Sequence, residues 1–400
     1  MLIFFVTNNY TPYSGGVTQS ITAMTNALRT QGHEVFVITL NFLEENHTDP
    51  DYVIRITCPI KFVYKNNHMA IPWRPTNTIE ELIKQHKPDI VHVHHPFLLG
   101  VSALRAARKC NIPCIFTYHT LYEQYAHYVP LPRMCLQPII RSAVGKFCNK
   151  VDAIIAPSNC VKNYLLSQKI MTPMTVIPSP LRESFNPILH GVHPDTSTSS
   201  AFAKASADTS TVNTSPEFNL LLVTRFALEK NIPFVFEVMQ LLPDNFRLTL
   251  AGYGTDYEKM QVLAFDTFKH CPTRICFIHK PTEKKLVELY RAADVFIFPS
   301  QTDTQGIVLA ESMSQGVPVV AVDGPGQRDI IVNEVNGFIV KDAADAAEKI
   351  SIIAHNPAVL QQLIAGAQTT AQKYHADCVV QQLLTAYRNT MQAYKQSPIS

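Results

Sequence analysis

Short apolar runs alternate with amphipathic stretches along most of this chain. Leu2–Thr7 is an apolar run, Val17–Arg29 carries apolar residues at helical spacing, and Glu34–Leu40 is the next apolar run. Buried strands of about four to eight residues that alternate with amphipathic helices are typical of βαβ units, whose strands are parallel. The pattern therefore predicts an α/β protein built on parallel sheets.

The same alternation runs to residue 177 and restarts at residue 218, while no element is predicted for residues 41–77. The predicted strands are 2–7, 34–40, 89–94, 113–118, 152–156, 175–177, 218–224, 246–251, 275–278, 295–299 and 317–322. The predicted helices are 17–29, 78–85, 98–110, 159–167, 231–240, 257–265, 283–292 and 306–315, followed by amphipathic helices over 345–395. Two doubly wound halves of this kind place their ligand sites beyond the carboxyl ends of the strands.

A change of composition separates the two halves. Eleven of the 24 residues in 194–217 are Ser or Thr, and large apolar side chains are nearly absent, which is typical of a flexible insertion. We therefore predict a first domain over 1–187, a linker over 188–217 and a second domain over 218–370. The remaining residues, 371–400, are expected to form a helix that packs back on the first domain.

Composition and charge exclude several classes of protein. Hydrophobic residues make up 46 % of the chain and its net charge is +2, which excludes global disorder and a nucleic-acid-coating role. Residues 1–187 carry 17 Lys and Arg against 11 Asp and Glu, which predicts an anionic partner for the first half. The nine cysteines lack zinc-site spacing and indicate reduced thiols in a cytoplasmic protein. No apolar run approaches about 18 residues, so any membrane contact is expected at the surface.

The segment Ser300–Ala321 concentrates the residues that suggest chemistry. Asp303 lies in the loop before a predicted helix, and Glu311 lies inside that helix. A carboxylate at the position of Glu311 can accept hydrogen bonds from ribose hydroxyls. The backbone N–H groups of Gln305, Gly306 and Ile307 lie at the helix N-terminus, which favours anions. On spacing alone, a pair of solvated carboxylates explains the pattern equally well.

Taken with other segments, this one resembles the E-x7-E region of retaining family 4 glycosyltransferases, with Asp303 in place of the first Glu. The supporting segments are RFALEK at Arg225–Lys230, AGYG at Ala251–Gly254, LYRAADVFIFPS at Leu289–Ser300 and GPGQRDIIVNEVNGFIV at Gly324–Val340, with Asp329 where Glu is common. In the first half, Gly15–Gly16–Val17 and His119 fit the same resemblance. It covers nearly the whole chain except 188–217.

The resemblance implies a GT-B architecture, in which two Rossmann-like domains face each other across a cleft and C-terminal helices cross back. It also implies a nucleotide-diphosphate sugar as co-substrate, with no metal and no cofactor. Arg225 and Lys230 would then stabilise the departing diphosphate, as cationic side chains do where no metal is present. Gly15 and Gly16 would let the backbone approach a phosphate closely, and His119 would hydrogen-bond the donor sugar. An ordinary αβ turn would also explain the two glycines.

Three histidines near the end of a predicted strand raise the question of a metal. His92 and His94 share one face of that strand and His95 follows, but no carboxylate or Cys stands at a matching spacing. We therefore expect these histidines to bind no metal, and the site to contain none.

The acceptor side is suggested by an aromatic stripe that follows His119. Tyr118, Tyr122, Tyr125 and Tyr128 recur at helical spacing, in a string that resembles diacylglycerol glucosyltransferases. Basic residues then stand beside apolar ones, as in an interfacial amphipathic helix. The basic residues expected to contact an anionic membrane are Arg133, Arg141, Lys146 and Lys150. A core helix with a solvated basic face, and tyrosines packed in the core, are the alternatives.

The sequence thus predicts a retaining hexosyltransferase that moves glucose from UDP-glucose to a lipid such as 1,2-diacylglycerol. We expect it to lie peripherally on the inner face of the cell membrane and to bind no nucleic acid. A family 4 enzyme acting on a soluble or polyprenyl-linked glycan is the first alternative. A degenerate protein that only binds nucleotide sugars is the second, although the presence of Arg225, Lys230, Glu311 and His119 argues against it.

Overall fold

The computed structural model describes residues 1–12, 15–42, 48–64, 67–122, 133–185 and 216–396. The chain divides into two compact units, Met1–Arg182 with Ala376–Ser400 and Glu183–His375. Each unit is built on its own sheet and core, and we describe each by itself. The predicted linker over 188–217 lies almost wholly outside the described residues.

The first unit contains a parallel seven-stranded sheet with the order β3-β2-β1-β6-β7-β8-β9. Its strands are β1 (Leu2–Val6), β2 (Glu34–Leu40), β3 (Val53–Ile56), β6 (Ile90–Val93), β7 (Cys114–Thr117), β8 (Ala153–Ala156) and β9 (Met174–Val176). Its helices are α1 (Gly16–Thr30), α2 (Pro75–His86), α3 (Leu99–Lys109), α4 (Arg133–Cys148), α5 (Asn159–Ser167) and α13 (Ala376–Gln396). A separate antiparallel hairpin consists of β4 (Ile60–Tyr64) and β5 (Asn67–Ile71).

Both faces of this sheet are buried, and successive residues of β1 show how. Phe4 and Val6 belong to one core cluster, whereas Ile3 and Phe5 belong to another that includes residues of α1 and α13. Side chains that alternate between two buried faces explain why the strands read as continuous apolar runs.

The second unit contains a six-stranded sheet with the order β12-β11-β10-β13-β14-β15, again parallel. Its strands are β10 (Phe218–Arg225), β11 (Phe246–Tyr253), β12 (Ile275–His279), β13 (Val295–Phe298), β14 (Val319–Val322) and β15 (Gly337–Val340). Its α-helices are α6 (Ile232–Leu241), α7 (Tyr257–Thr267), α8 (Glu283–Arg291), α9 (Ile307–Ser314), α10 (Gln327–Ile330), α11 (Ala343–His355) and α12 (Pro357–Ala371). Its short 3₁₀ helices are η2 (Glu183–Phe185), η5 (Leu228–Lys230), η6 (Pro272–Arg274) and η7 (Gln372–Tyr374).

Several helices begin at a side-chain cap that the sequence supplies. The hydroxyl of Ser158 accepts a hydrogen bond from the backbone N–H of Val161 at the start of α5, and Thr282 does the same for Lys285 at the start of α8. A capping oxygen satisfies a helical N–H group that would otherwise lack a partner, at a gain of about 1 kcal/mol.

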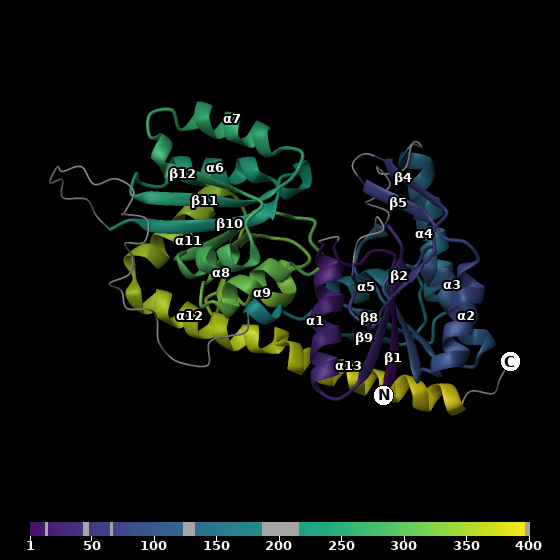
Figure 1. The fold of residues 1–400 in the computed structure, drawn as a ribbon. Helices are drawn as coiled ribbons and strands as arrows, with labels where there is room; N and C mark the ends of the chain where they lie inside the picture. Colours follow the sequence, from purple (N-terminus) through teal and green to yellow (C-terminus); the bar gives the residue numbers. More distant parts are fainter. Residues whose placement is uncertain (13–14, 43–47, 65–66, 123–132, 186–215, 397–400) are drawn as a thin grey trace. The chain divides into compact units, whose positions relative to one another are not determined.

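The last helix returns to the first unit. Val379, Val380, Leu383 and Leu384 of α13 are buried against α1 and the sheet, and Figure 1 shows α13 running along this unit beside α1. The chain enters the second unit at Glu183 and leaves it after His375, where the expected boundaries were 187 and 370. Phe185 accounts for the earlier entry, because it is fully buried with its ring 5.6 Å from that of Tyr290 on α8.

The predicted α/β class is confirmed, since both sheets are parallel and helices connect most of their successive strands. The sequence analysis assigned nothing to residues 41–77, and this was incomplete, because β3, β4 and β5 lie there. Among the described residues, no helix is both long and apolar enough to cross a bilayer.

Candidate active site

In the first unit, the predicted site residue His119 and its neighbours lie where parallel strands end. β6 is followed directly by His94 and His95, and β7 is followed by Tyr118 and His119. Because β6 and β7 are hydrogen-bonded neighbours, these residues meet at one edge of the sheet.

His119 is held by a second histidine. Nδ1 of His94 lies 2.9 Å from Nε2 of His119, and the two rings are stacked with centroids 5.2 Å apart. His94 is fully buried, and its Nε2 has no hydrogen-bond partner among the described residues. A buried N–H without an acceptor is costlier than a bare ring nitrogen. This favours the tautomer in which His94 donates from Nδ1 and His119 carries its own hydrogen on Nδ1.

Burial keeps both rings neutral. It lowers the pKa of His119 to about 3, with a smaller contribution from the charge of His95, and it lowers the pKa of His94 well below its usual range. Burial alone lowers the pKa of His95 to about 4. At physiological pH, His119 therefore acts as a neutral hydrogen-bonding group rather than as a cation.

His92 has a structural role, because both of its ring nitrogens form hydrogen bonds within the first unit. Its Nδ1 lies 2.6 Å from the hydroxyl of Tyr387 on α13, and its Nε2 lies 2.6 Å from the hydroxyl of Thr117. Both ring nitrogens are thus committed to protein groups, so His92 has none left for a metal. Within the described ranges, no three His, Cys, Asp or Glu side chains form a metal-binding group. That catalysis proceeds without a metal stays a prediction.

A small cavity adjoins His119. It has a volume of about 10 Å³, room for roughly one water molecule. Ser20 of α1 and Ser179 line it together with His119. Sequence reasoning gave no role to Ser20, which sits in the helix that follows the two glycines.

Gly15 and Gly16 begin α1, with Gly15 as the N-cap residue. A Cβ atom added to Gly16 would meet nothing within 4 Å, so packing inside this unit does not require glycine there. That the backbone at these two glycines approaches a phosphate stays a prediction.

In the second unit, two predicted donor-site residues form an ion pair. The ammonium of Lys230 lies 2.7 Å from Oδ1 and 2.9 Å from Oδ2 of Asp303, and both side chains are largely buried. The loop after β10 and the loop after β13 therefore meet at the carboxyl edge of this sheet, where β10 and β13 are neighbours. Arg225 instead contacts Glu229 at 3.2 Å and is partly exposed, so the two predicted cations do not share one partner.

Glu311 is positioned by a tyrosine that sequence reasoning did not single out. Glu311 lies in α9 and is only 3 % exposed, and its Oε2 accepts a hydrogen bond from the hydroxyl of Tyr290 at 3.2 Å. Tyr290 of α8 is itself fully buried. The segment Leu289–Ser300 carried the family resemblance, but nothing in its periodicity indicated that Tyr290 points toward Glu311.

Two glycines shape the loop around Asp303 and the start of α9. Gly306 has φ +63° and caps α9, where the backbone N–H of Leu309 bonds its carbonyl at 2.8 Å. A Cβ on Gly326 would stand 2.8 Å from the carbonyl oxygen of Asp303 and equally close to the backbone of Gln305. The closing segment after β14 thus fits beneath the loop only because residue 326 has no side chain.

The helix α4, predicted to contact a membrane, is partly a core helix. Leu136, Val144 and Phe147 are buried, and Ile140 packs against the core. Among the side chains of α4 that the structure describes, Ile139 is the large apolar one that is exposed. Arg141, Lys146 and Lys150 are exposed, and no carboxylate among the described residues pairs with them. The buried apolar residues fit the alternative of a core helix with a solvated basic face. Contact of the basic residues with a membrane stays a prediction. The side chain of Arg133 lies outside the described residues.

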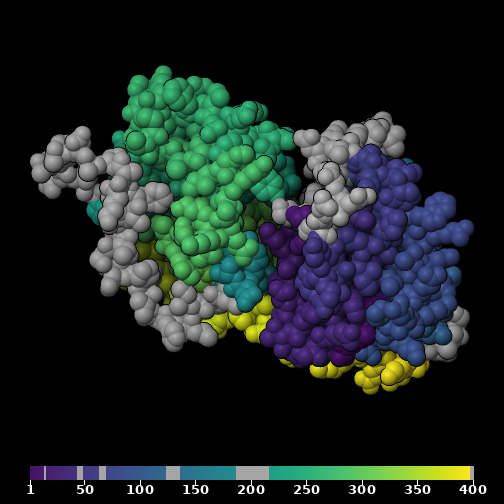
Figure 2. All heavy atoms as spheres, viewed as in Figure 1, coloured from purple at the N-terminus to yellow at the C-terminus, as the bar shows by residue number. Residues whose placement is uncertain are grey.

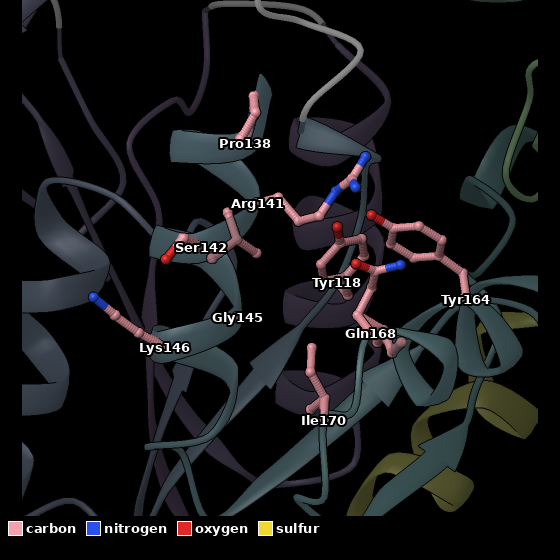
Figure 3. Close-up of a pocket in the computed structure, with 11 residues that line it drawn as sticks. Tyr118, Pro138, Arg141, Ser142, Gly145, Lys146, Tyr164, Gln168 and Ile170 are labelled. Atoms are coloured by element: carbon pink, nitrogen blue, oxygen red, sulfur yellow. The ribbon is translucent and has the colours of Figure 1, made fainter. Parts of the chain in front are cut away.

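A pocket of about 300 Å³ lies between α4 and α5. Figure 3 shows the guanidinium of Arg141, the hydroxyls of Tyr118 and Tyr164 and the amide of Gln168 pointing toward one another within it. Tyr118 is fully buried, so this member of the predicted stripe belongs to the core. Tyr122 packs its ring 5.4 Å from that of Tyr118, and Tyr125 and Tyr128 lie outside the described residues.

Two family models match the chain. The one described as Glycosyltransferase Family 4 matches residues 14–184, and the one described as Glycosyl transferases group 1 matches residues 207–370.

Among curated proteins, the chain is similar to two alpha-monoglucosyldiacylglycerol synthases. The protein from Streptococcus pneumoniae is 29 % identical over 88 % of this chain and 77 % of its own length. The protein from Acholeplasma laidlawii is 26 % identical over 94 % of this chain and 93 % of its own. Among solved structures, the sucrose-phosphate synthase from Thermosynechococcus elongatus matches with a TM-score of 0.75 and 20 % identity, over 98 % of this chain and 99 % of that one.

Proposed function

This chain belongs to glycosyltransferase family 4 and has the GT-B fold, and on that premise we propose that it transfers glucose, with retention, from UDP-glucose to a membrane lipid such as 1,2-diacylglycerol. That it transfers a sugar follows from the family. The observation that carries the acceptor and the sugar is the similarity, over most of the chain, to two synthases named for α-monoglucosyldiacylglycerol.

The second unit has the chemistry to bind the donor. The departing diphosphate gains charge as the glycosidic bond breaks, and Lys230, Arg225 and the N-terminus of α9 are the groups that would stabilise it. Asp303 holds the ammonium of Lys230 in place through both carboxylate oxygens. Glu311 would accept hydrogen bonds from the ribose hydroxyls, with its carboxylate oriented by Tyr290.

The first unit would bind the acceptor. His119, kept neutral by burial, would donate a hydrogen bond from Nδ1 to a sugar or acceptor oxygen without adding charge. The exposed Arg141, Lys146 and Lys150 would draw this unit to an anionic membrane on the cytoplasmic side. Each contributes about 1 kcal/mol, which salt screens over about 10 Å at 0.1 M. A bound lipid could then reach His119.

The test is an assay of the purified protein with UDP-glucose and diacylglycerol, with the lipid product identified by mass spectrometry. We expect a glucosylated diacylglycerol, undiminished by EDTA. Lys230→Ala and Arg225→Ala should each lower kcat/KM about 100-fold or more. Transfer only to a soluble or polyprenyl-linked glycan would replace the lipid acceptor. Binding of UDP-glucose with no transfer and no hydrolysis would mean a degenerate binding protein.

A further inference from the structure

The hairpin β4–β5 presents paired apolar side chains to solvent. Ile60 stands opposite Ile71, and Phe62 stands opposite Met69, so all four project from the same face of the hairpin. Their exposed fractions range from 44 to 54 %, and Trp73, which follows β5, is 66 % exposed. We call these five residues the hairpin face.

The opposite side of the hairpin is used by the fold. Ala70, next to Met69 and Ile71 in β5, is 4 % exposed and belongs to the core of the first unit. The hairpin is therefore anchored through one face and leaves its more apolar face outside. Folded monomers rarely expose a contiguous apolar patch of this kind unless it contacts something.

The charge around the hairpin face selects one partner class. Residues 52–79 contain no Asp or Glu, and their basic residues include Arg74, which follows Trp73, and Lys61, which lies in β4 between Ile60 and Phe62 on the alternate face. The guanidinium of Arg74 lies 5.8 Å from the centre of the Trp73 ring. Tryptophan beside basic residues, together with aliphatic side chains, is the combination found where proteins lie in the headgroup region of anionic bilayers.

The hairpin also lies at the edge of the sheet where the catalytic residues are. It belongs to the connection between β3 and α2, which leaves the carboxyl end of a parallel strand, as does the chain from β7 to His119. Figure 1 shows β4 and β5 at the end of this unit opposite to the chain's N-terminus, and Figure 2 shows this segment at the surface of the unit.

We propose that the hairpin face inserts into the headgroup region of an anionic lipid bilayer and so docks the first unit. The inference deepens the proposed function, on which it rests for the meaning of such docking, because a lipid acceptor would then be presented at the edge that carries His119. A second copy of this chain or a protein partner on the same face would be a different outcome of the test below.

Trp73 makes the test direct, because it is the single tryptophan of the chain. The full-length protein is mixed with vesicles of phosphatidylcholine and phosphatidylglycerol, and tryptophan emission is recorded. We expect a blue shift, and quenching when the phospholipids carry brominated acyl chains. Sedimentation with the vesicles without any change in emission would overturn the proposal. So would a shift that appears on raising the protein concentration without lipid, since a second copy would then cover the face.

Matched substitutions distinguish lipid binding through the hairpin face from nonspecific adsorption through any exposed apolar side chain. Phe62→Ser and Met69→Ser should each weaken vesicle binding roughly tenfold, because each removes a large apolar side chain from the lipid contact. Phe265→Ser on α7 is the control, since Phe265 is an exposed phenylalanine of the second unit, at 68 %. Equal binding by all three variants and the parent would contradict the proposal.

The two hypotheses fail separately. Glucosylation of diacylglycerol in detergent without a Trp73 response to vesicles would remove the hairpin proposal and leave the function. Insertion of Trp73 into vesicles without transfer of glucose to any lipid would remove the proposed function and leave the hairpin proposal.

Discussion

His94 is the residue on which the geometry of His119 depends. In the favoured tautomer its fully buried side chain donates to Nε2 of His119, and that side chain makes no other hydrogen bond with the described residues. We therefore regard His94 as a positioning residue, because its hydrogen bond orients the ring of His119 and fixes the tautomer of that ring. Its neighbour in β6, His92, instead ties β6 to β7 and α13 through two short hydrogen bonds.

Two replacements of His94 test this role, because an Asn amide reaches the position of Nδ1 whereas a Gln amide reaches that of Nε2. His94→Asn should keep the donor to His119 and retain most of kcat. His94→Gln should lower kcat roughly tenfold with little change in the donor KM, as expected when a hydrogen bond is lost. Nitrogen NMR of His119 should show its Nδ1–H tautomer in the parent and His94→Asn only. The same tautomer and kcat in both variants would contradict the role.

Glu311 and Tyr290 form a second pair at this scale. Glu311→Gln should weaken binding of UDP, because an amide accepts less strongly from hydroxyls than a carboxylate. Removing the ribose 2′-hydroxyl should then cost the variant less affinity than it costs the parent, as measured by calorimetry. Tyr290→Phe, which removes only one hydroxyl, should give a smaller loss in the same direction. Equal losses in parent and Glu311→Gln would show that the carboxylate does not contact the ribose.

At the scale of elements, the loop from Asp303 to the start of α9 is shaped by a neighbour. The closing segment after β14 approaches so closely that the backbone N–H of Gly326 bonds the carbonyl of Asp303 at 2.9 Å. The position of Asp303, and through it that of Lys230, thus depends on a backbone contact from another part of the unit.

Gly326→Ala should therefore disturb the donor loop. The new Cβ would press on backbone atoms of Asp303 and Gln305, which cannot rotate away, so we expect a loss of about 1–3 kcal/mol in stability and weaker UDP binding. Gly145→Ala is the matched control, since it lies in α4 with nothing within 4 Å of the added atom and should stabilise by about 0.5–1 kcal/mol. Urea unfolding and calorimetry measure both effects. Unchanged UDP affinity in Gly326→Ala would show that the contact does not shape the site.

The sequence was most informative where the local pattern is strong, as in strands buried on both faces and helices that begin at a side-chain cap. β10 and α5, for example, were predicted almost residue for residue, because buried parallel strands and capped helices leave clear local patterns. The hairpin was missed because its apolar residues face outward, so its pattern does not identify a core strand. The pairing of Lys230 with Asp303 could not be predicted either, since it joins loops 73 residues apart.

At the scale of the whole molecule, four histidines that are buried or half-buried lie in one unit. His92, His94, His95 and His119 all lie in the first unit, and burial lowers the pKa of each. An unfolded histidine has a pKa near 6.5, so below that pH the unfolded chain binds protons that the folded unit excludes. Stability is therefore fully present above about pH 6.5 and falls as the pH drops toward the folded values.

Acid should accordingly weaken the first unit before the second. Each such histidine lowers the free energy of unfolding by about 1.4 kcal/mol per pH unit in that window. Hydrogen exchange at pH 7 and pH 5, corrected for intrinsic rates, should show protection lost in β6 and β7 while β10 and β13 change less. Equal loss in both sheets would mean that the buried histidines do not set the acid response.

The return of α13 to the first unit also bears on biosynthesis. A ribosome releases residues 1–182 long before it releases Tyr387, yet the hydroxyl of Tyr387 bonds His92, and four apolar residues of α13 close one face of the sheet. Until the final stretch of chain emerges, the face of the sheet that carries Ile3 and Phe5 is covered by α1 but lacks the apolar residues of α13. The order of assembly is thus reversed from the usual one in which the N-terminal domain matures first. The second unit can finish folding while the first still waits for its last helix, and a nascent chain stalled after residue 375 would hold an open apolar face that chaperones could bind.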